Sequence, residues 1–263
     1  MKKQVMLALC LLAAAPAFAG DKVCGTSKNL ASPFYMPKDN QWVVDAQTDF
    51  TRSKVAPVKA WTIDALAEVG YGVTDNVKVF VQGGNIWDRW KPAGTGSRSE
   101  NHNEQWGVGA SYNMFSESFP ILATVAYLQA RTHGYQGDYK AIFADVKKDF
   151  CTCCKCDIDS YVGASIEVPI FQSAVNSNDE PKYSGYAGIF RPWTSWLATD
   201  LRGIFSYDSE TSTRKPSVFG EVSVLPFENV ALGVYAEQAL WAKTKNHNNV
   251  HEQTVGVEAK VQF

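Results

Sequence analysis

The chain ends with the stretch TVGVEAKVQF, residues 254–263, in which apolar residues at odd positions alternate with polar or small residues at even positions. Successive side chains of a β-strand point to opposite faces, so this pattern predicts a strand with one apolar and one polar face. The apolar face carries Val255, Val257, Ala259, Val261 and Phe263. The sequence stops on the aromatic Phe263, without a polar tail.

The same period of two recurs along the chain and predicts about twelve strands. Short turns, such as 74–76, alternate with longer polar connections, such as 88–104. The pattern does not decide which face is apolar in four segments, so about ten to fourteen strands remain open. The expected strands are 41–52, 59–73, 77–88, 104–115, 120–131, 139–150, 158–170, 182–191, 197–207, 217–226, 230–241 and 251–263. The four segments of undecided face are 77–88, 120–131, 139–150 and 182–191.

The C-terminal strand resembles the assembly signal of bacterial outer-membrane barrels, and Val257, Val261 and Phe263 carry this resemblance. The stretch 68–77 resembles a strand–turn–strand found widely in such barrels. The resemblance to porin-like outer-membrane proteins implies an all-β fold, a closed antiparallel transmembrane β-barrel. It also implies two partners, the outer-membrane lipids and the β-barrel assembly machinery. A soluble periplasmic β-sandwich stays open as the alternative, because period two alone does not separate the two folds.

The N-terminus has the features of a secretory signal peptide, residues 1–19. Lys2 and Lys3 precede the apolar stretch 5–15, and Ala17-Phe18-Ala19 follows as a cleavage site. Residues 20–40 lack the strand pattern and are expected to be a periplasmic segment or a plug that reaches into the lumen. The barrel is expected over 41–263. No later apolar run is long enough for a membrane-spanning helix, and the expected location is the bacterial outer membrane after export through the periplasm.

The polar faces of the expected strands would line the lumen, and their acids outnumber their bases. Such a lining favours a small channel for ions or small polar solutes, with a preference for cations. The alternative is a lumen packed with paired charges, in a non-conducting structural or surface-interaction barrel. The net charge of −2 gives no reason to expect nucleic acid as a partner. The expected lining residues are Asp45, Asp64, Glu68, Glu167, Asp200, Arg202, Glu221, Glu237, Glu258 and Lys260.

A dense cysteine group, Cys151-Thr-Cys153-Cys154-Lys-Cys156, lies at an expected periplasmic turn, and Cys24 lies in the N-terminal segment. An oxidising compartment favours disulfides between the two Cys-x-Cys units, with Cys24 left over. The spacing also resembles that of metallothioneins, which implies thiolate metal capture as the competing interpretation.

The histidines lie in or beside expected outer loops, where ordinary solvated residues are the simplest interpretation; they are His102, His133, His247 and His251. A hydrolase of the outer-membrane protease type is the functional alternative. No phosphate-binding loop, H-E-x-x-H or G-x-S-x-G pattern occurs. The sequence therefore predicts neither an enzyme nor a cofactor.

Overall fold

A computed structural model describes residues 29–55, 58–92, 99–114, 121–133, 138–150, 158–172, 180–243 and 251–263. It contains β1 (Trp42–Val55), β2 (Val58–Thr74), β3 (Val77–Pro92), β4 (Ser99–Met114), β5 (Ile121–His133), β6 (Asp138–Asp149), β7 (Asp159–Gln172), β8 (Lys182–Thr194), β9 (Leu197–Asp208), β10 (Thr213–Phe227), β11 (Val230–Ala239) and β12 (His251–Gln262). The sequence predicted all twelve of these strands. Several extend further than predicted where their side chains are polar, as in β4 and β10, because backbone pairing does not require apolar side chains.

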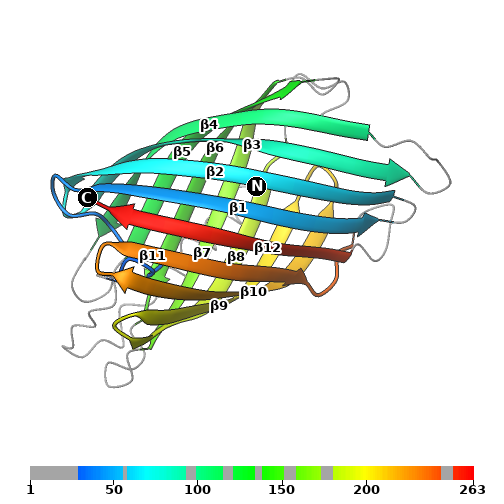
Figure 1. Cartoon of the computed structure of the whole chain (residues 1–263). Helices are drawn as coiled ribbons and strands as arrows, with labels where there is room; N and C mark the ends of the chain where they lie inside the picture. The colour runs from blue at the N-terminus through cyan, green and yellow to red at the C-terminus, as the bar shows by residue number, and fades with distance from the viewer. Residues whose placement is uncertain are drawn as a thin grey trace.

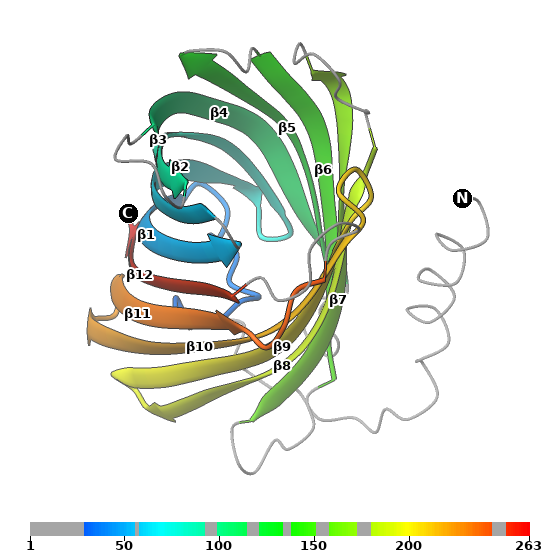
Figure 2. The same cartoon turned by 90° about the vertical axis from the view of Figure 1, so that its right-hand side faces the viewer.

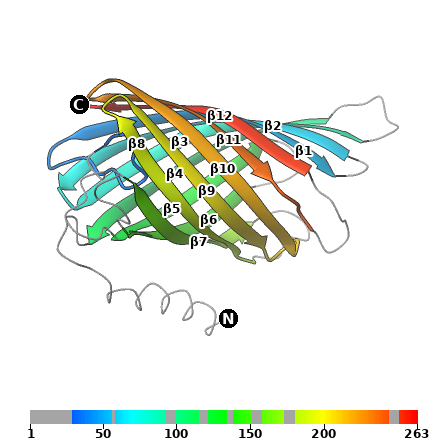
Figure 3. The same ribbon diagram turned by 90° about the horizontal axis from the view of Figure 1, so that it is seen from below.

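The strands form one closed barrel in which each pairs antiparallel with the next and β1 pairs with β12 (Figures 1 and 2). In Figure 3, strands β8, β9 and β10 slant across β4 and β5 of the opposite wall, because the strands of a barrel tilt relative to its axis. The closure runs to the last residue. Phe263 donates its N–H to the Trp42 carbonyl at 2.9 Å, and Trp42 donates to the Phe263 carbonyl at 3.1 Å. Closure leaves no open sheet edge. A sheet in a bilayer must be closed in this way, whereas the sheets of a sandwich keep open edges. The barrel prediction is confirmed, and the β-sandwich alternative is wrong.

The two ends of the barrel differ. The start of β1 and the end of β12 lie at the end that carries the tight turns, for example between Thr74 and Val77 and between Thr194 and Leu197 (Figure 1). In outer-membrane barrels the short turns face the periplasm. We therefore call this the periplasmic end, and the opposite one the loop end.

The outer surface is apolar around the barrel. Val257 of β12 is 54% exposed and Leu201 of β9 is 56% exposed. The structure also decides the segments that the sequence left open, since outward apolar residues appear in each of them: Val79 and Val81 in β3, Val125 in β5, Ile142 in β6 and Ile189 in β8. A monomer in water rarely exposes apolar surface on this scale, and a lipid bilayer covers it. No helix among the described residues is long and apolar enough to cross a membrane.

The lipid-facing position of Val257 gives a first testable prediction. Val257→Arg should lower the free energy of unfolding in a bilayer by about 2–4 kcal/mol, because a charged side chain near the midplane loses its hydration. His251→Arg is the matched control, since His251 has the same orientation at the loop end of the same strand. The comparison is made by urea titration in lipid vesicles. Equal costs for the two variants would contradict the assignment of the lipid face.

Candidate functional site: the charged lumen

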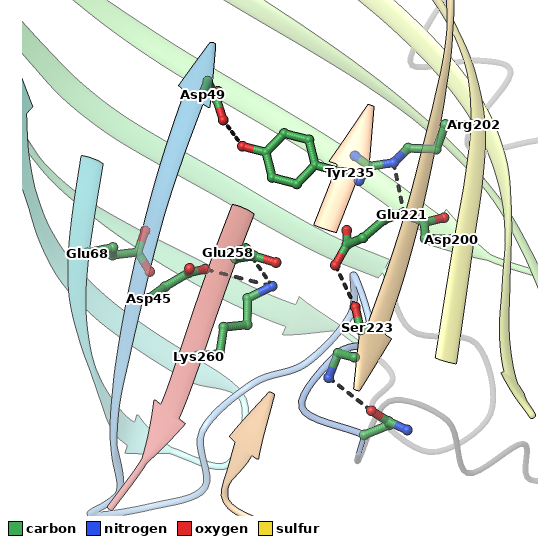
Figure 4. A network of polar contacts seen from close by, with 12 residues as sticks. Asp45, Asp49, Glu68, Asp200, Arg202, Glu221, Ser223, Tyr235, Glu258 and Lys260 are labelled. Carbon is green, nitrogen blue, oxygen red and sulfur yellow. Dashed lines mark hydrogen bonds and ion pairs between the residues drawn. The ribbon is translucent and has the colours of Figure 1, made fainter. Parts of the chain in front are cut away.

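The inner face of the barrel carries all ten of the residues that the sequence predicted to line a pore. Each alternates along its strand with outward apolar neighbours, and Figure 4 shows seven of them around the interior. They come together in several separate pairs and clusters, not in one ring.

The first cluster joins β12 to β1 near the periplasmic end. Lys260 Nζ lies 2.9 Å from Glu258 Oε1 and 3.7 Å from Asp45 Oδ2 (Figure 4). The three side chains are 15–26% exposed. One lysine is therefore shared by two largely buried carboxylates, and each carboxylate depends on it for charge compensation.

Other cations of the lumen also form ion pairs with carboxylates. Arg202 Nε lies 2.9 Å from Asp200 Oδ2, and the Tyr161 hydroxyl donates to the other oxygen of Asp200 at 2.5 Å. The remaining pairs are Lys78–Glu68 at 2.7 Å, Lys182–Glu167 at 2.9 Å, Lys215–Glu252 at 2.6 Å and the longer Lys215–Glu237 at 3.9 Å.

A second group of carboxylates is held by neutral donors. Asp64 accepts a hydrogen bond from the Gln105 amide at 3.1 Å, and Glu221 accepts one from the Ser223 hydroxyl at 2.6 Å. The others are Asp49 with Tyr235, Asp88 with Thr62 and Asp145 with Tyr186. These neutral contacts position the acids without cancelling their charge, so the lumen carries an excess of negative charge.

The tyrosines of this lining were not predicted from the sequence. Three of them lie over an inward glycine on the neighbouring strand, in the register pairs Tyr235–Gly256, Tyr186–Gly163 and Tyr161–Gly188. A Cβ at any of these glycines would approach the tyrosine ring within 2.2–2.6 Å. An inward glycine in the sequence could have indicated these tyrosine positions, because it leaves room for a ring from the neighbouring strand to lie across the sheet.

The periplasmic end of the lumen is occupied by residues 29–37, which enter it ahead of β1 (Figure 2). Two short backbone hydrogen bonds, Ser32 N to Asn29 O at 2.8 Å and Tyr35 N to Ser32 O at 3.0 Å, fold this segment into turns. Leu30 and Phe34 are only 2% and 1% exposed.

Around Leu30 and Phe34, inward residues from seven strands form one apolar cluster. The Phe34 and Tyr161 rings meet edge to face with centroids 5.6 Å apart, and Lys147 Nζ lies 5.7 Å from the Phe34 ring. The barrel members of the cluster are Val43, Leu122, Tyr161, Phe190, Ala198, Leu225 and Ala231. The 29–37 segment therefore narrows the lumen at its periplasmic end by apolar packing.

The loop end is different in character. A cavity of about 340 Å³ lies there, lined by the two ion pairs Lys182–Glu167 and Lys215–Glu252. Hydroxyl groups complete much of its wall, including those of Ser165, Ser184, Ser206, Thr211 and Thr213. The interior thus combines a polar chamber at the loop end with an apolar constriction at the other.

The remaining candidate residues contribute no lumen chemistry in the part of the chain described. His102 lies on the outer face, with its ring stacked on Trp87 at 5.4 Å and its Nε2 2.9 Å from Asn85 Oδ1. The signal-peptide prediction and the cysteine predictions, for Cys24, Cys151, Cys153, Cys154 and Cys156, lie outside the described residues, as do the side chains of His133 and His247. The described residues contain no cluster of three or more metal-binding side chains.

Comparison with solved structures places the fold among outer-membrane barrels. The COG4313 outer membrane channel from Pseudomonas putida F1 superposes with a TM-score of 0.65 at 9% identity, over 87% of this chain and 97% of that one. The beta domain of the Bordetella autotransporter BrkA gives 0.61 at 9% identity, over 86% and 100%. The translocator domain of autotransporter NalP from Neisseria meningitidis gives 0.52 at 10% identity, over 100% and 95%.

No family model matches the sequence, and no curated protein matches it. At such low identities the structural likenesses establish the fold alone. The molecule is a closed twelve-stranded β-barrel of the outer-membrane type.

Proposed function

We propose that the protein is an outer-membrane channel for small cations and small polar solutes, with the 29–37 segment closing its periplasmic end. The observation that carries the proposal is the set of lumen carboxylates with neutral partners, such as Asp49, Asp64 and Glu221. Fixed negative charge in a narrow wet passage raises the local concentration of cations and lowers that of anions. The likeness to a barrel named as a channel supports the same class of function.

The test is ion selectivity in planar bilayers. Replacing the three acids together, Asp49→Asn, Asp64→Asn and Glu221→Gln, should move the reversal potential in a salt gradient toward zero, because the surplus charge is lost. These acids are better targets than Glu68 and Glu237, which take part in ion pairs. Removing Glu68 would leave Lys78 without its carboxylate partner, and removing Glu237 would take away one of the two carboxylates near Lys215.

The matched control replaces an exposed acid of a periplasmic turn, Glu228→Gln, and should leave the reversal potential unchanged. If wild-type openings are too rare to measure, the same comparison is made in a Phe34→Ala variant, whose packing at the periplasmic end is loosened. A reversal potential that the triple replacement does not alter would refute the selectivity proposal.

A second candidate, a non-conducting structural barrel, is favoured by one observation. The apolar cluster around Leu30 and Phe34 joins side chains from seven strands, as a permanent seal would. Loosening that cluster distinguishes the two candidates, because a channel then opens whereas a permanently packed barrel stays silent.

We also propose transport rather than catalysis as the class of function, and the β-barrel assembly machinery as the partner that inserts the chain. Support for the latter comes from the C-terminus. Val257 of β12 and Phe263, which directly follows β12, are 54% and 71% exposed, and Phe263 completes the closure with Trp42.

A further inference from the structure

Five cationic side chains gather on the outer face of the barrel at the loop ends of three adjacent strands, Arg52, Lys54, Lys59, Arg89 and Lys91. All five are exposed. Each lies an even number of positions from an outward apolar residue of the same strand and is therefore on the same face, away from the lumen. These apolar residues are Phe50 in β1, Ile63 in β2 and Trp87 in β3. We call these five residues the basic patch. Figure 1 shows β1, β2 and β3 side by side on the near wall.

The strand register arranges the basic patch in two rows. Lys54 pairs directly with Lys59, and Lys59 pairs with Lys91. In the next row Trp61 lies between Arg52 and Arg89. Like charges placed directly opposite one another destabilise a sheet, so a row of three lysines calls for a negative counter-charge from elsewhere.

The described part of the chain supplies little of that counter-charge. Arg89 Nε forms an exposed ion pair with Glu100 at 2.9 Å. Within the described residues, no ion pair involves Arg52, Lys54, Lys59 or Lys91. These four cations are therefore available to an external anion.

The level of the patch in the membrane identifies the kind of anion. The row directly below it, toward the periplasm, is apolar and exposed: Phe50, Ile63 and Trp87 pair in register and are 43%, 42% and 41% exposed. Two residues along a strand span about 7 Å. The basic patch thus begins where the hydrocarbon-facing surface ends on the loop side, which is the level of the outer-leaflet head groups.

Among the described residues, the row of three lysines lies on one side of the barrel. Elsewhere outward cations occur singly or in pairs: Arg131 lies opposite Asp138, and Arg214 lies between Tyr207 and Lys243. On β8 and β9 the outward residues near the loop end are Tyr183 and Tyr207, whose rings stack with centroids 6.4 Å apart. The restriction to β1–β3 is typical of a site that binds a ligand at one place.

We propose that the basic patch binds the phosphate groups of a phosphorylated glycolipid of the outer leaflet, while the acyl chains of that lipid cover Phe50, Ile63 and Trp87. The guanidinium of Arg52 can donate two hydrogen bonds to one phosphate, and the lysines add compact positive charge. Binding depends on the phosphate groups and the acyl chains together. A soluble anion, which has no acyl chains, would therefore bind more weakly than such a lipid. This site is independent of the proposed transport function.

The experiment titrates the purified full-length barrel in detergent with diphosphoryl lipid A and follows the bound lipid by native mass spectrometry. The test variant combines Arg52→Gln, Lys54→Gln, Lys59→Gln and Lys91→Gln. The matched control combines Arg131→Gln, Lys140→Gln and Arg214→Gln, which remove outward cations from the loop ends of β5, β6 and β10. Heat-modifiable migration verifies that each variant is folded.

The wild type and the control should bind diphosphoryl lipid A with similar affinity, and the test variant should bind it about a hundredfold or more weakly. Lipid A from which both phosphates have been removed should bind wild type and test variant equally weakly. Equal affinity of the test and control variants for diphosphoryl lipid A would overturn the proposal. So would undiminished wild-type binding of the dephosphorylated lipid, because the acyl chains alone would then explain retention.

Discussion

Phe34→Ala should convert a mostly closed barrel into one that opens readily in planar bilayers. Phe34 is 1% exposed within the cluster that seats the 29–37 segment. Truncating a buried phenylalanine to alanine costs about 3–5 kcal/mol. If about 3 kcal/mol of that loss falls on docking of the segment, the ratio of undocked to docked molecules rises by about a hundredfold, since each 1.4 kcal/mol is tenfold. The open probability should increase accordingly.

Single-channel recording of the purified protein provides the measurement, and Lys38→Ala is the control. Lys38 directly follows the 29–37 segment but is exposed, so its truncation removes no apolar packing. Deletion of residues 29–37 should produce a larger and more persistent conductance than Phe34→Ala. If both changes leave the bilayer silent while the protein remains folded, the channel proposal fails and the non-conducting alternative is favoured.

Replacing the shared lysine of the lumen should have the largest effect on stability. Lys260→Met keeps much of the side-chain volume but leaves Asp45 and Glu258 facing each other without a cation. Removing one partner of a largely buried ion pair costs about 3–5 kcal/mol. We expect the free energy of unfolding in lipid vesicles to fall by that amount, and the selectivity for cations to increase because the lumen gains negative charge.

A double replacement separates the charge effect from lost packing. Glu258→Gln in the Lys260→Met background removes one of the two uncompensated carboxylates, so it should recover part of the lost stability. Glu228→Gln, an exposed acid at a periplasmic turn, should recover none. Equal stability of Lys260→Met and the wild type would mean that water, rather than Lys260, compensates the charges of Asp45 and Glu258.

The sequence predicts the barrel well because lipid imposes a strict alternation on many strands. In β12, β1 and β2, every second residue faces outward, and the inward residues Asp45, Glu68 and Lys260 follow from the same pattern. Alternation is weaker in β6, where Lys140 and Lys148 lie on the same outward face of the strand as Ile142. Inward residues such as Asp145 were therefore missed.

The contacts inside the lumen could not be predicted in this way. Alternation gives the face of a side chain but not its partner, so neither the sharing of Lys260 nor the tyrosine contacts were accessible. For residues 20–40 the sequence left two interpretations, a periplasmic segment or a plug in the lumen, and it did not identify the contacts of residues 29–37. Its apolar residues Leu30 and Phe34 follow no strand period, and their burial depends on residues from distant strands that meet only after folding.

The pairing of β1 with β12 also has a consequence for the order of folding. Every other strand pair joins neighbours in the chain, whereas this one joins the two ends, as in the Thr51–Thr254 hydrogen bond across 203 positions. Contacts between distant residues carry the largest loop-closure entropy and form slowly. The seam should therefore be the last pairing to form. Because residues 29–37 are attached directly ahead of β1, we expect the step that closes the ring to enclose them as well, so that assembly delivers a barrel in which this segment is already docked.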